Sequence, residues 1–299
     1  MRRSALLLVA LPAALAAAGA SAQNLSVVSQ TTLAGVAYPE SIGCDPARKA
    51  LYVSEFVSKL APTQKDGAGR IAKLSLAGQV LERKFLPAPG GEPLNKPKGI
   101  WVRGDRLWVT DIDVVWVFDL KTRKGRKVAL PGAQFANDPA VVDGKLYVSD
   151  NVGDMLFRVE PADFLNLKGE PKVAQVFRGA GVNPNGVYPQ KDGMLLMVGF
   201  VAPGKPRGIF ALGVSGQIKD LSGPIGRLDG VYELRDGSLL VTDWNLGWLF
   251  QWSESRGMRE LATGFKGPAD FCVFPSKGGL TVAVPDLVQS QVRLVQLKR

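Results

Sequence analysis

Short runs in which apolar and polar residues alternate recur along the chain, and turn residues separate them. RIAKLSL, LYVSD, GIFAL and VRLVQL are examples of the runs, and the turn pairs include Asp143-Gly144, Asp192-Gly193 and Asp236-Gly237. A period of two residues is typical of β-strands, and Asp-Gly pairs favour tight hairpin turns. No long helical pattern competes with these strands. The pattern therefore predicts an all-β fold.

One hairpin pattern occurs six times: a short apolar strand that begins beside a polar residue, a turn, and a second apolar strand. The first apolar residue of each second strand recurs at steps of 56, 39, 49, 44 and 41 residues, at Leu51, Leu107, Leu146, Leu195, Leu239 and Leu280. Each unit has room for four strands of about five or six residues. We therefore predict a six-bladed β-propeller with four-stranded blades around a central channel.

The two ends of the chain are expected to close this ring. The strand-like segment from Asn24 to Gly35 precedes the first unit and has no blade of its own, whereas QVRLVQLK ends the last unit. Pairing the first segment as the outer edge of the sixth sheet would lock the ring and cover an exposed edge. With 34 Gly and 20 Pro in 299 residues, the composition suits one large all-β domain, which we assign to residues 23–299.

The first 22 residues have the pattern of a signal peptide. A basic start, MRR, precedes an apolar run from Ala5 to Ala18, and the triplet ASA at 20–22 matches a signal-peptidase site. The alternative is a membrane anchor, but the run is shorter than the roughly 20 residues that cross a bilayer. We expect cleavage before Gln23 and a periplasmic or secreted protein with no integral membrane segment after cleavage.

Composition excludes several classes of chemistry. The chain contains no histidine, which removes a Ser-His-Asp triad, a Cys-His pair and His-ligated zinc. Its net charge is +10, and +8 remains once residues 1–22 are removed, because 35 basic and 27 acidic residues are left. These basic residues are scattered rather than clustered, so we expect no nucleic-acid partner.

The two cysteines, Cys44 in the first unit and Cys272 in the last, become neighbours when the ring closes. An oxidising compartment favours a disulfide between them. Counted from the equivalent polar position of each unit, however, Cys44 is four residues along and Cys272 three, so their side chains are expected on opposite sides of their sheets. On this ground we predict buried free thiols in preference to a bridge.

Alignment of the six units places one residue of each at the start of the inner strand. The expected ring at one mouth of the channel consists of Glu40, Lys98, Asp138, Asn185, Asp229 and Ala269, and Asn137 can join it from the third blade. The antiparallel second strands bring further acids to the same face, namely Glu55, Asp111, Asp150 and Asp243. Converging Glu, Asp and Asn oxygens suit a hard divalent cation.

A purely structural reading of these residues is the alternative. Asp and Asn beside turns bond to their own backbone, and Lys98 could neutralise Glu40 directly. We favour the structural role for the second-strand residues Asp111, Asp150 and Asp243. We favour a binding site for Glu40, Asn185 and Asp229.

Four short motifs resemble the regucalcin and gluconolactonase group of six-bladed propellers, and the resemblance covers essentially all of residues 23–299. The motifs are PES with Glu40, NDP with Asn137 and Asp138, PNG with Asn185, and LDG with Asp229. The resemblance implies one divalent cation, Ca, Mg, Mn or Zn, held by Glu40, Asn185 and Asp229, with Asn137 in contact with bound water or substrate. It implies metal-assisted hydrolysis of a lactone, such as a sugar-acid lactone, or a related ester, in which Asp229 accepts a proton from water.

Two positions depart from the pattern of that group. The substrate-binding Arg upstream of the Asn-Asp pair is missing, since the sequence reads Gln134-Phe135-Ala136-Asn137, and Lys98 adds a positive charge to the ring. Together with Asn137 and Asp138, Lys98 is a candidate for contact with the substrate. A non-catalytic propeller of the NHL type, which binds a ligand or protein partner at the channel mouth, is the alternative function, and a strictosidine-synthase-like enzyme is a third.

Two long loops are expected beside this site. The first step between units is the longest, and its extra residues lie in VSKLAPTQKDGAGR at 57–70 and PAPGGEPLNKP at 87–97. Long loops beside a binding site are usually functional. We expect both loops to overhang the channel mouth.

Overall fold

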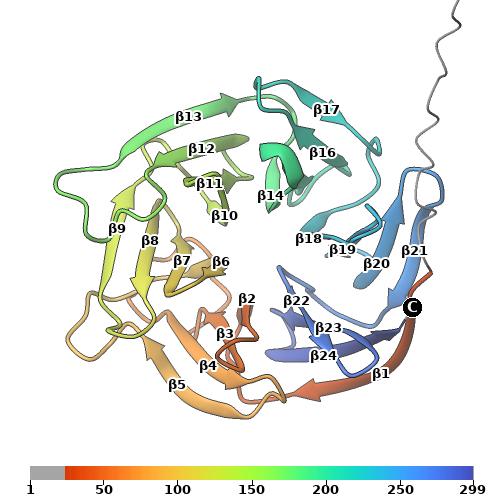
Figure 1. Ribbon diagram of the computed structural model, residues 1–299, viewed down its shortest axis with the longest axis horizontal. Coiled ribbons are helices and arrows are strands. Elements are labelled where there is room, and N and C mark those ends of the chain that lie inside the picture. Colours follow the sequence, from red (N-terminus) through yellow and green to blue (C-terminus); the bar gives the residue numbers. More distant parts are fainter. Residues whose placement is uncertain (1–23, 299) are drawn as a thin grey trace, which may run out of the picture.

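The computed structural model describes residues 24–298 and contains six four-stranded antiparallel sheets arranged radially around a channel (Figure 1). The predicted six-bladed β-propeller is confirmed. The predicted signal peptide, residues 1–22, lies outside the described residues. Among the described residues, no helix is long and apolar enough to cross a membrane.

The strands follow the order expected from the repeat. The first blade contains β2 (Pro39–Asp45), β3 (Ala50–Glu55), β4 (Arg70–Ser75) and β5 (Val80–Leu86). The second contains β6 (Pro97–Arg103), β7 (Arg106–Asp111), β8 (Val114–Asp119) and β9 (Gly125–Ala129). The third contains β10 (Ala136–Val142), β11 (Lys145–Asp150), β12 (Met155–Glu160) and β13 (Lys172–Arg178).

The remaining blades repeat this order. The fourth contains β14 (Pro184–Pro189), β15 (Leu195–Gly199), β16 (Ile209–Leu212) and β17 (Ile218–Asp220), with a 3-10 turn, η1 (Lys191–Gly193), in its first hairpin. The fifth contains β18 (Leu228–Glu233), β19 (Leu239–Asp243), β20 (Trp248–Ser253) and β21 (Gly257–Ala262). The sixth contains β22 (Cys272–Ser276), β23 (Gly279–Asp286), β24 (Gln291–Lys298) and β1 (Ser26–Leu33).

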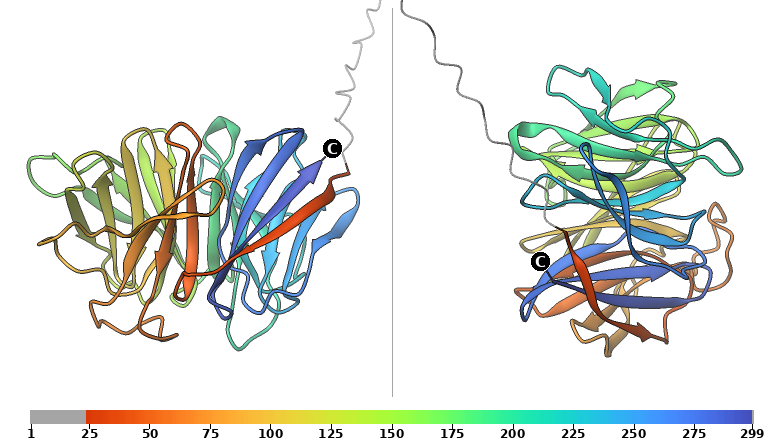
Figure 2. Two further views of the ribbon diagram at one scale, coloured as in Figure 1. Left: turned by 90° about the horizontal axis from the view of Figure 1, so that it is seen from below. Right: turned by 90° about the vertical axis from the view of Figure 1, so that its right-hand side faces the viewer.

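The N-terminal strand closes the ring as predicted. β1 pairs antiparallel with β24, from Ser26 opposite Lys298 to Leu33 opposite Val292. Figure 2 shows β1 running along the outside of the last sheet, where it covers the edge that β24 would otherwise leave free. The first and last parts of the described chain are therefore held together by backbone hydrogen bonds.

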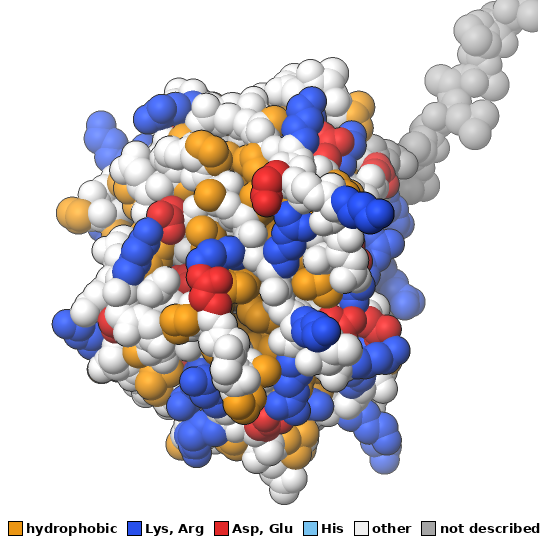
Figure 3. Space-filling view, turned by 90° about the vertical axis from the view of Figure 1, so that its left-hand side faces the viewer, with side chains coloured by type: hydrophobic (Ala, Val, Ile, Leu, Met, Phe, Trp, Pro, Cys, Tyr) orange, Lys and Arg blue, Asp and Glu red, His pale blue; other side chains and the backbone are white. Residues whose placement is uncertain are grey.

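The hydrophobic core is divided among the junctions between neighbouring blades. Six clusters of buried side chains are present, and each joins two adjacent sheets. Successive residues of one strand point to opposite sides of the sheet, so Leu195 of β15 packs toward the third blade and Leu196 toward the fifth. Figure 3 shows Lys and Arg side chains scattered over the surface of one side of the molecule.

Cys44 and Cys272 form a disulfide between the first and last blades, with their Cα atoms 5.7 Å apart. The prediction of free thiols was wrong for a geometric reason. Neighbouring blades pack face to face, so one side of the sixth sheet meets the opposite side of the first. Residues on opposite sides of their own sheets can therefore point toward each other, and both cysteines pack in the cluster at this junction.

We expect loss of the disulfide to lower the stability of the folded ring. The bond links residues 228 positions apart, and removing a native disulfide typically lowers the free energy of unfolding by about 2–5 kcal/mol. Denaturant unfolding of a Cys44→Ala/Cys272→Ala double variant, compared with the oxidised protein, measures this difference. Equal stability of the two proteins would show that the pairing of β1 with β24 alone closes the ring.

Candidate active site

A bulge lies at the start of the inner strand in each of the first five blades. The register with the second strand shifts by one residue just after Pro39, Pro97, Ala136, Pro184 and Leu228. The residues that follow these positions are Glu40, Lys98, Asn137, Asn185 and Asp229. A bulge breaks the alternation of a strand and re-aims a side chain. The repeated bulge therefore places one polar residue from each of these five blades at the same level of the channel.

The register corrects the alignment of the third blade. Ala136 pairs with Asp150 in the same way that Leu228 pairs with Asp243, so Asn137 is the equivalent of Asp229. Asp138 is the next residue along β10, one position past the ring. Both residues are polar, and polarity alone does not fix the register. In the sixth blade Ala269 occupies the ring position, as predicted, and Asp270 follows it.

Hydroxyl groups on the second strands hold the bulges and join neighbouring blades. The Thr242 hydroxyl accepts a hydrogen bond from the Gly230 N–H at 2.8 Å and donates one to the Ala269 carbonyl of the next blade at 3.1 Å. Ser149 repeats this arrangement with the Asp138 N–H and the Asn185 carbonyl. The ring is thus tied to a buried network, which limits how far its side chains move.

The acids at the ends of the second strands have the structural role that we favoured for them. Asp111 accepts hydrogen bonds from the backbone N–H groups of Asn95 at 2.7 Å and Lys96 at 2.8 Å. Asp243 accepts them from Asn245 and Leu246 at 2.7 and 2.8 Å. Asp150 does the same for Gln134, Phe135 and Gly153. These carboxylates fix loops through backbone donors, and Asp243 does so through Oδ1 alone, since its Oδ2 has no donor within the described residues.

A cavity of about 370 Å³, here called the ring cavity, opens above the ring. Four ring residues line its floor, namely Glu40, Asn137, Asn185 and Asp229. Its wall is formed largely by the residues that follow five of the six second strands, namely Phe56, Asn151, Phe200, Trp244 and Leu287. Sequence motifs do not reveal these wall residues, although the repeat alignment that gives the floor residues also gives their positions. Leu60, Pro62, Phe135, Val152 and Ala202 complete the lining.

Five buried oxygens in this cavity have no hydrogen-bond donor within the described part of the chain. They are Glu40 Oε2, Asn137 Oδ1, Asn151 Oδ1, Asn185 Oδ1 and Asp229 Oδ1. A buried polar atom without a partner is unfavourable by about 1–3 kcal/mol, so such atoms are rare in native proteins. Their concentration in one cavity indicates a place for a ligand that accepts electron pairs or donates hydrogen bonds.

The acids of the channel are held in an environment that favours their neutral forms. Burial raises the pKa of Glu40 well above its usual range, and the charge of Asp229 raises it further. The pKa of Asp229 is likewise raised well above its usual range, first by burial and then by Asp270, whereas the Asn185 amide lowers it. Burial also raises the pKa of Asp270 to about 7. Carboxyls in this state bind a cation with release of protons.

Lys98 belongs to the ring by position but does not line the cavity. Its side chain is fully buried, and its Nζ lies 4.3 Å from the centre of the Phe135 ring and 5.9 Å from that of Phe56. Burial lowers the pKa of Lys98 to about 8, against the opposing effect of Glu40. In turn, Lys98 lowers the pKa of Glu40. Lys98 is thus a positive charge behind the aromatic wall.

The first long loop overhangs the site as predicted, and a buried lysine fixes it. Leu60 and Pro62 of this loop line the cavity. Lys96 Nζ donates hydrogen bonds to the Phe56 carbonyl at 3.1 Å, to Ser58 Oγ at 2.8 Å and to Asp66 Oδ2 at 2.8 Å.

The second loop, residues 87–97, was also expected over the mouth but contributes no lining residue. It packs against the first loop instead, where the Gly69 N–H donates to the Leu94 carbonyl at 2.9 Å.

We expect Lys96→Met to loosen the first loop. The substitution preserves most of the side-chain volume but leaves the partners of Nζ without their donor, which costs about 1–3 kcal/mol. Amide hydrogen exchange of residues 58–68 should become faster, and exchange in the β18–β19 hairpin should not. Asp66→Asn, which retains an acceptor for Lys96, should have a smaller effect. Unchanged exchange in Lys96→Met would contradict a fixing role for this lysine.

Further cavities lie outside this site, and two of them bear on the predicted residues or on the choice of site. One of about 170 Å³ lies further along the inner strands and is lined by Asp138 and Asp270 together with Trp101, Tyr188 and Tyr232. The predicted substrate residue Asp138 is therefore turned away from the ring cavity, and its Oδ2 accepts a hydrogen bond from the Val187 N–H at 2.7 Å.

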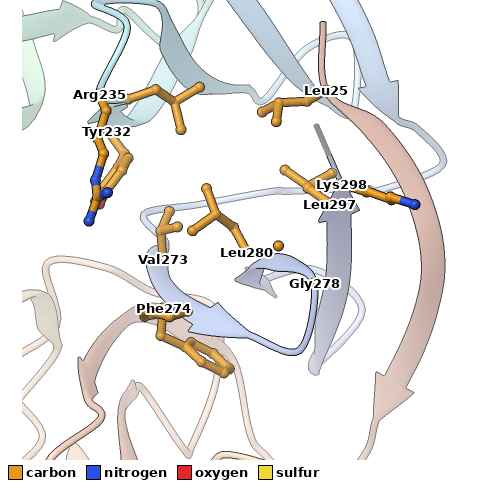
Figure 4. A pocket seen from close by; sticks show the side chains of 12 residues that line it. Leu25, Tyr232, Arg235, Val273, Phe274, Gly278, Leu280, Leu297 and Lys298 are labelled. Carbon is orange, nitrogen blue, oxygen red and sulfur yellow. The ribbon is translucent and has the colours of Figure 1, made fainter. Parts of the chain in front are cut away.

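Another cavity, of about 430 Å³, lies between the fifth and sixth blades, where Arg235 and Lys298 lie on opposite sides (Figure 4). It is lined mainly by apolar residues and no carboxylate is among the residues that line it. It therefore offers none of the chemistry of the ring cavity.

Comparison with known proteins supports the fold. No protein-family model and no curated protein sequence matches the chain. A gluconolactonase from Xanthomonas campestris aligns with a TM-score of 0.67 and 13% identity over 91% of this chain and 91% of its own. A streptogramin B lyase aligns with a TM-score of 0.62 and 13% identity over 90% of this chain and 98% of its own. A chain of a nidogen–laminin complex aligns with a TM-score of 0.56 and 18% identity over 75% of this chain and 79% of its own.

The predicted likeness to the gluconolactonase propellers is confirmed at the level of the fold. The same fold carries a lyase and a chain of a laminin complex, so it does not by itself select a function. The function must therefore be inferred from the chemistry of the ring cavity.

Proposed function

We propose that this protein is an exported hydrolase of lactones or related esters that uses one divalent cation. Glu40, Asn185 and Asp229 would hold the cation, with Asn137 beside them. The observation that carries the proposal is the set of five oxygens in the ring cavity that have no hydrogen-bond donor within the described residues, four of which belong to the floor. A cation would satisfy several of these oxygens at once and would stabilise the charged forms of Glu40 and Asp229.

The residues present fit a hard cation. Among residues 24–298 there is no group of three or more His, Cys, Asp or Glu placed to hold a metal. The floor instead combines two carboxylates with the amides of Asn137 and Asn185. Carboxylate and amide oxygens are typical ligands of Ca²⁺, Mg²⁺ and Mn²⁺, whereas Zn²⁺ sites usually contain Cys or His. We therefore place the first three ions ahead of Zn²⁺.

The side chains of the floor supply the remaining steps of hydrolysis. When bound, the cation would act as a Lewis acid on the carbonyl and lower the pKa of a water molecule. Asp229 accepts the proton as the water oxygen bonds to the carbonyl carbon, because its Oδ1 is free of other donors. The bond from this carbon to the ring or ester oxygen then breaks, and Asp229 returns the proton to that oxygen. With the cation bound, Asp229 would be ionised, which is the state that a base needs in order to accept a proton.

The proposal is tested by metal analysis of the purified protein and by a screen of lactones and aryl esters with and without chelator. Turnover that chelator abolishes and that Ca²⁺, Mg²⁺ or Mn²⁺ restores is the expected result. Reactions in ¹⁸O-labelled water distinguish hydrolysis from elimination, since only hydrolysis places the label in the acid product. Absence of turnover with every cation, or turnover that is indifferent to chelator, would overturn the proposal.

A second candidate is a propeller that binds a ligand or protein partner without catalysis. The exposed apolar residues at the mouth favour it, since Leu60 is 44% and Val152 56% exposed. This candidate predicts no turnover in the same screen. It also predicts that ligand binding is independent of Asp229 as a base.

A further inference from the structure

The wall of the ring cavity differs in chemistry from its floor. All the unsatisfied carboxylate oxygens of the cavity belong to the floor, whereas nine of the ten remaining lining residues are apolar. These nine are Phe56, Leu60, Pro62, Phe135, Val152, Phe200, Ala202, Trp244 and Leu287. The reacting group of a substrate would meet polar atoms, and the rest of the substrate would meet apolar side chains.

No Lys or Arg is among the residues that line this cavity, all of which lie in the described part of the chain. Lys98 is fully buried behind the rings of Phe56 and Phe135 and is not part of the lining. A substrate carboxylate or phosphate would therefore have no cationic partner on the wall. The hydroxyl groups of a sugar-acid lactone would find only Asn151 there, and each hydroxyl left unpaired would lower affinity by about tenfold.

The apolar wall is held in place. Phe200 and Trp244 contact each other edge to face, with their ring centres 6.1 Å apart. Lys96 fixes the loop that carries Leu60 and Pro62. A wall that does not have to be ordered on binding loses less affinity to conformational entropy.

Apolar surface continues from the wall onto the rim. Leu60 and Val152 line the cavity and are also partly open to solvent. Val288, which is 44% exposed, lies beside Trp244 near Gly267. Exposed apolar side chains around a cavity are typical of a binding site for an apolar group. The rim therefore extends the room for such a group beyond the cavity itself.

We propose that the site takes an uncharged lactone or ester whose non-reacting part is an alkyl chain or an aryl ring, in preference to a sugar-acid lactone. This inference rests on the proposed function and names its substrate class. The reacting carbonyl lies at the floor beside Asp229. The apolar part lies against Phe135, Phe200 and Trp244.

The test compares three substrates that share a six-membered lactone ring: δ-valerolactone, δ-decalactone and glucono-δ-lactone. The measured quantity is kcat/KM of the wild-type protein loaded with Ca²⁺, Mg²⁺ or Mn²⁺. Each methylene buried against the wall should raise kcat/KM about fourfold, so δ-decalactone should exceed δ-valerolactone by on the order of 10²-fold or more. Glucono-δ-lactone should fall below δ-valerolactone. A value for glucono-δ-lactone equal to or above that of δ-decalactone would overturn the inference.

Two variants locate the preference. Trp244→Ala and Phe135→Ala should each lower the ratio of kcat/KM between δ-decalactone and δ-valerolactone by about tenfold or more, as expected for losing part of an apolar contact. Trp101→Ala is the matched control, since it makes the same truncation beside the other cavity of the channel. It should leave the ratio unchanged even if it lowers stability. An unchanged ratio in both wall variants would overturn the inference.

Binding of stable analogues separates this inference from the proposed function. Calorimetry compares 6-pentylpiperidin-2-one with piperidin-2-one, two lactams that replace the ester oxygen by N–H. Tighter binding of the pentyl compound without any lactone hydrolysis would refute the hydrolase and support the apolar ligand class. Hydrolysis of lactones without preference for the pentyl group would support the hydrolase and refute the apolar class.

Discussion

We expect Asp229→Asn to slow lactone hydrolysis by about 10²- to 10⁴-fold, the usual range for loss of a general base. The amide of Asn occupies nearly the same volume but does not accept a proton from water. It also removes one of the two negative charges of the floor, so the affinity for the divalent cation should fall as well. The fold should persist, because Asp229 Oδ1 has no hydrogen-bond partner to lose within the described residues.

Asp243→Asn is the matched control for this prediction. Asp243 lies in the same blade and is equally buried, but its Oδ1 accepts hydrogen bonds from the backbone of Asn245 and Leu246. Its substitution should lower the free energy of unfolding by about 1 kcal/mol and leave cation affinity nearly unchanged. Calorimetric cation titration and steady-state kinetics of both variants make the comparison. Equal affinity and equal activity in both variants would remove Asp229 from the site.

The repeat is the part of this protein that its sequence predicts well. A two-residue period and turn pairs fix the strands, and aligned units place Glu40, Asn185 and Asp229 at the same level. The closing strand follows from the same count, because Asn24–Gly35 has no blade of its own and an open edge needs a partner. These inferences depend on local pattern and on the number of units, and both are visible along the chain.

The errors arose where the answer depends on how sheets face one another. Cys44 and Cys272 point to opposite sides of their own sheets, yet neighbouring blades present opposite sides to each other. Within the third blade, Asn137 and Asp138 are both polar, so only the pairing of Ala136 with Asp150 shows which one joins the ring. Strand register and the packing of adjacent sheets are tertiary properties, and alternation alone does not set them.

The apolar wall was missed for a different reason. Its positions follow directly from the repeat, since Phe200 and Trp244 each come just after a second strand. Aromatic residues in a propeller are most simply explained as packing between blades, and their type gave no reason to prefer a cavity. The structure distinguishes the two roles because these side chains line the space above Glu40 and Asp229.

The affinity for the divalent cation is expected to rise steeply with pH. The raised pKa values of Glu40 and Asp229 mean that both carboxyls carry protons over a range in which exposed acids are already charged. Each proton that cation binding displaces increases the apparent affinity by about tenfold per pH unit below the relevant pKa. Titration calorimetry from pH 5 to pH 8 in two buffers of different ionisation enthalpy measures both the affinity and the number of protons released.

The same groups set the stability of the cation-free protein, with a defined sign. A carboxyl whose pKa is higher in the folded than in the unfolded chain binds more protons when folded, so it favours the folded state at low pH. That contribution is lost as the pH rises from about 4. For Asp270 the loss ends near its folded pKa of about 7. The Tm of the cation-free protein should therefore fall across this window, and added cation should raise Tm more at pH 8 than at pH 5.

The variant Glu40→Gln tests whether the ring carboxyls cause the pH dependence of the cation affinity. The variant removes one titrating ligand, so the number of protons released on cation binding should drop by about one and the affinity should depend less steeply on pH. Asp138→Asn is the control, because Asp138 is also buried and has a raised pKa but lines the other cavity. Asp138→Asn should change neither the number of protons released on cation binding nor the steepness with which the cation affinity depends on pH. If Glu40→Gln behaved like Asp138→Asn, the cation would have to bind away from Glu40, and the ring would be a structural feature of the channel.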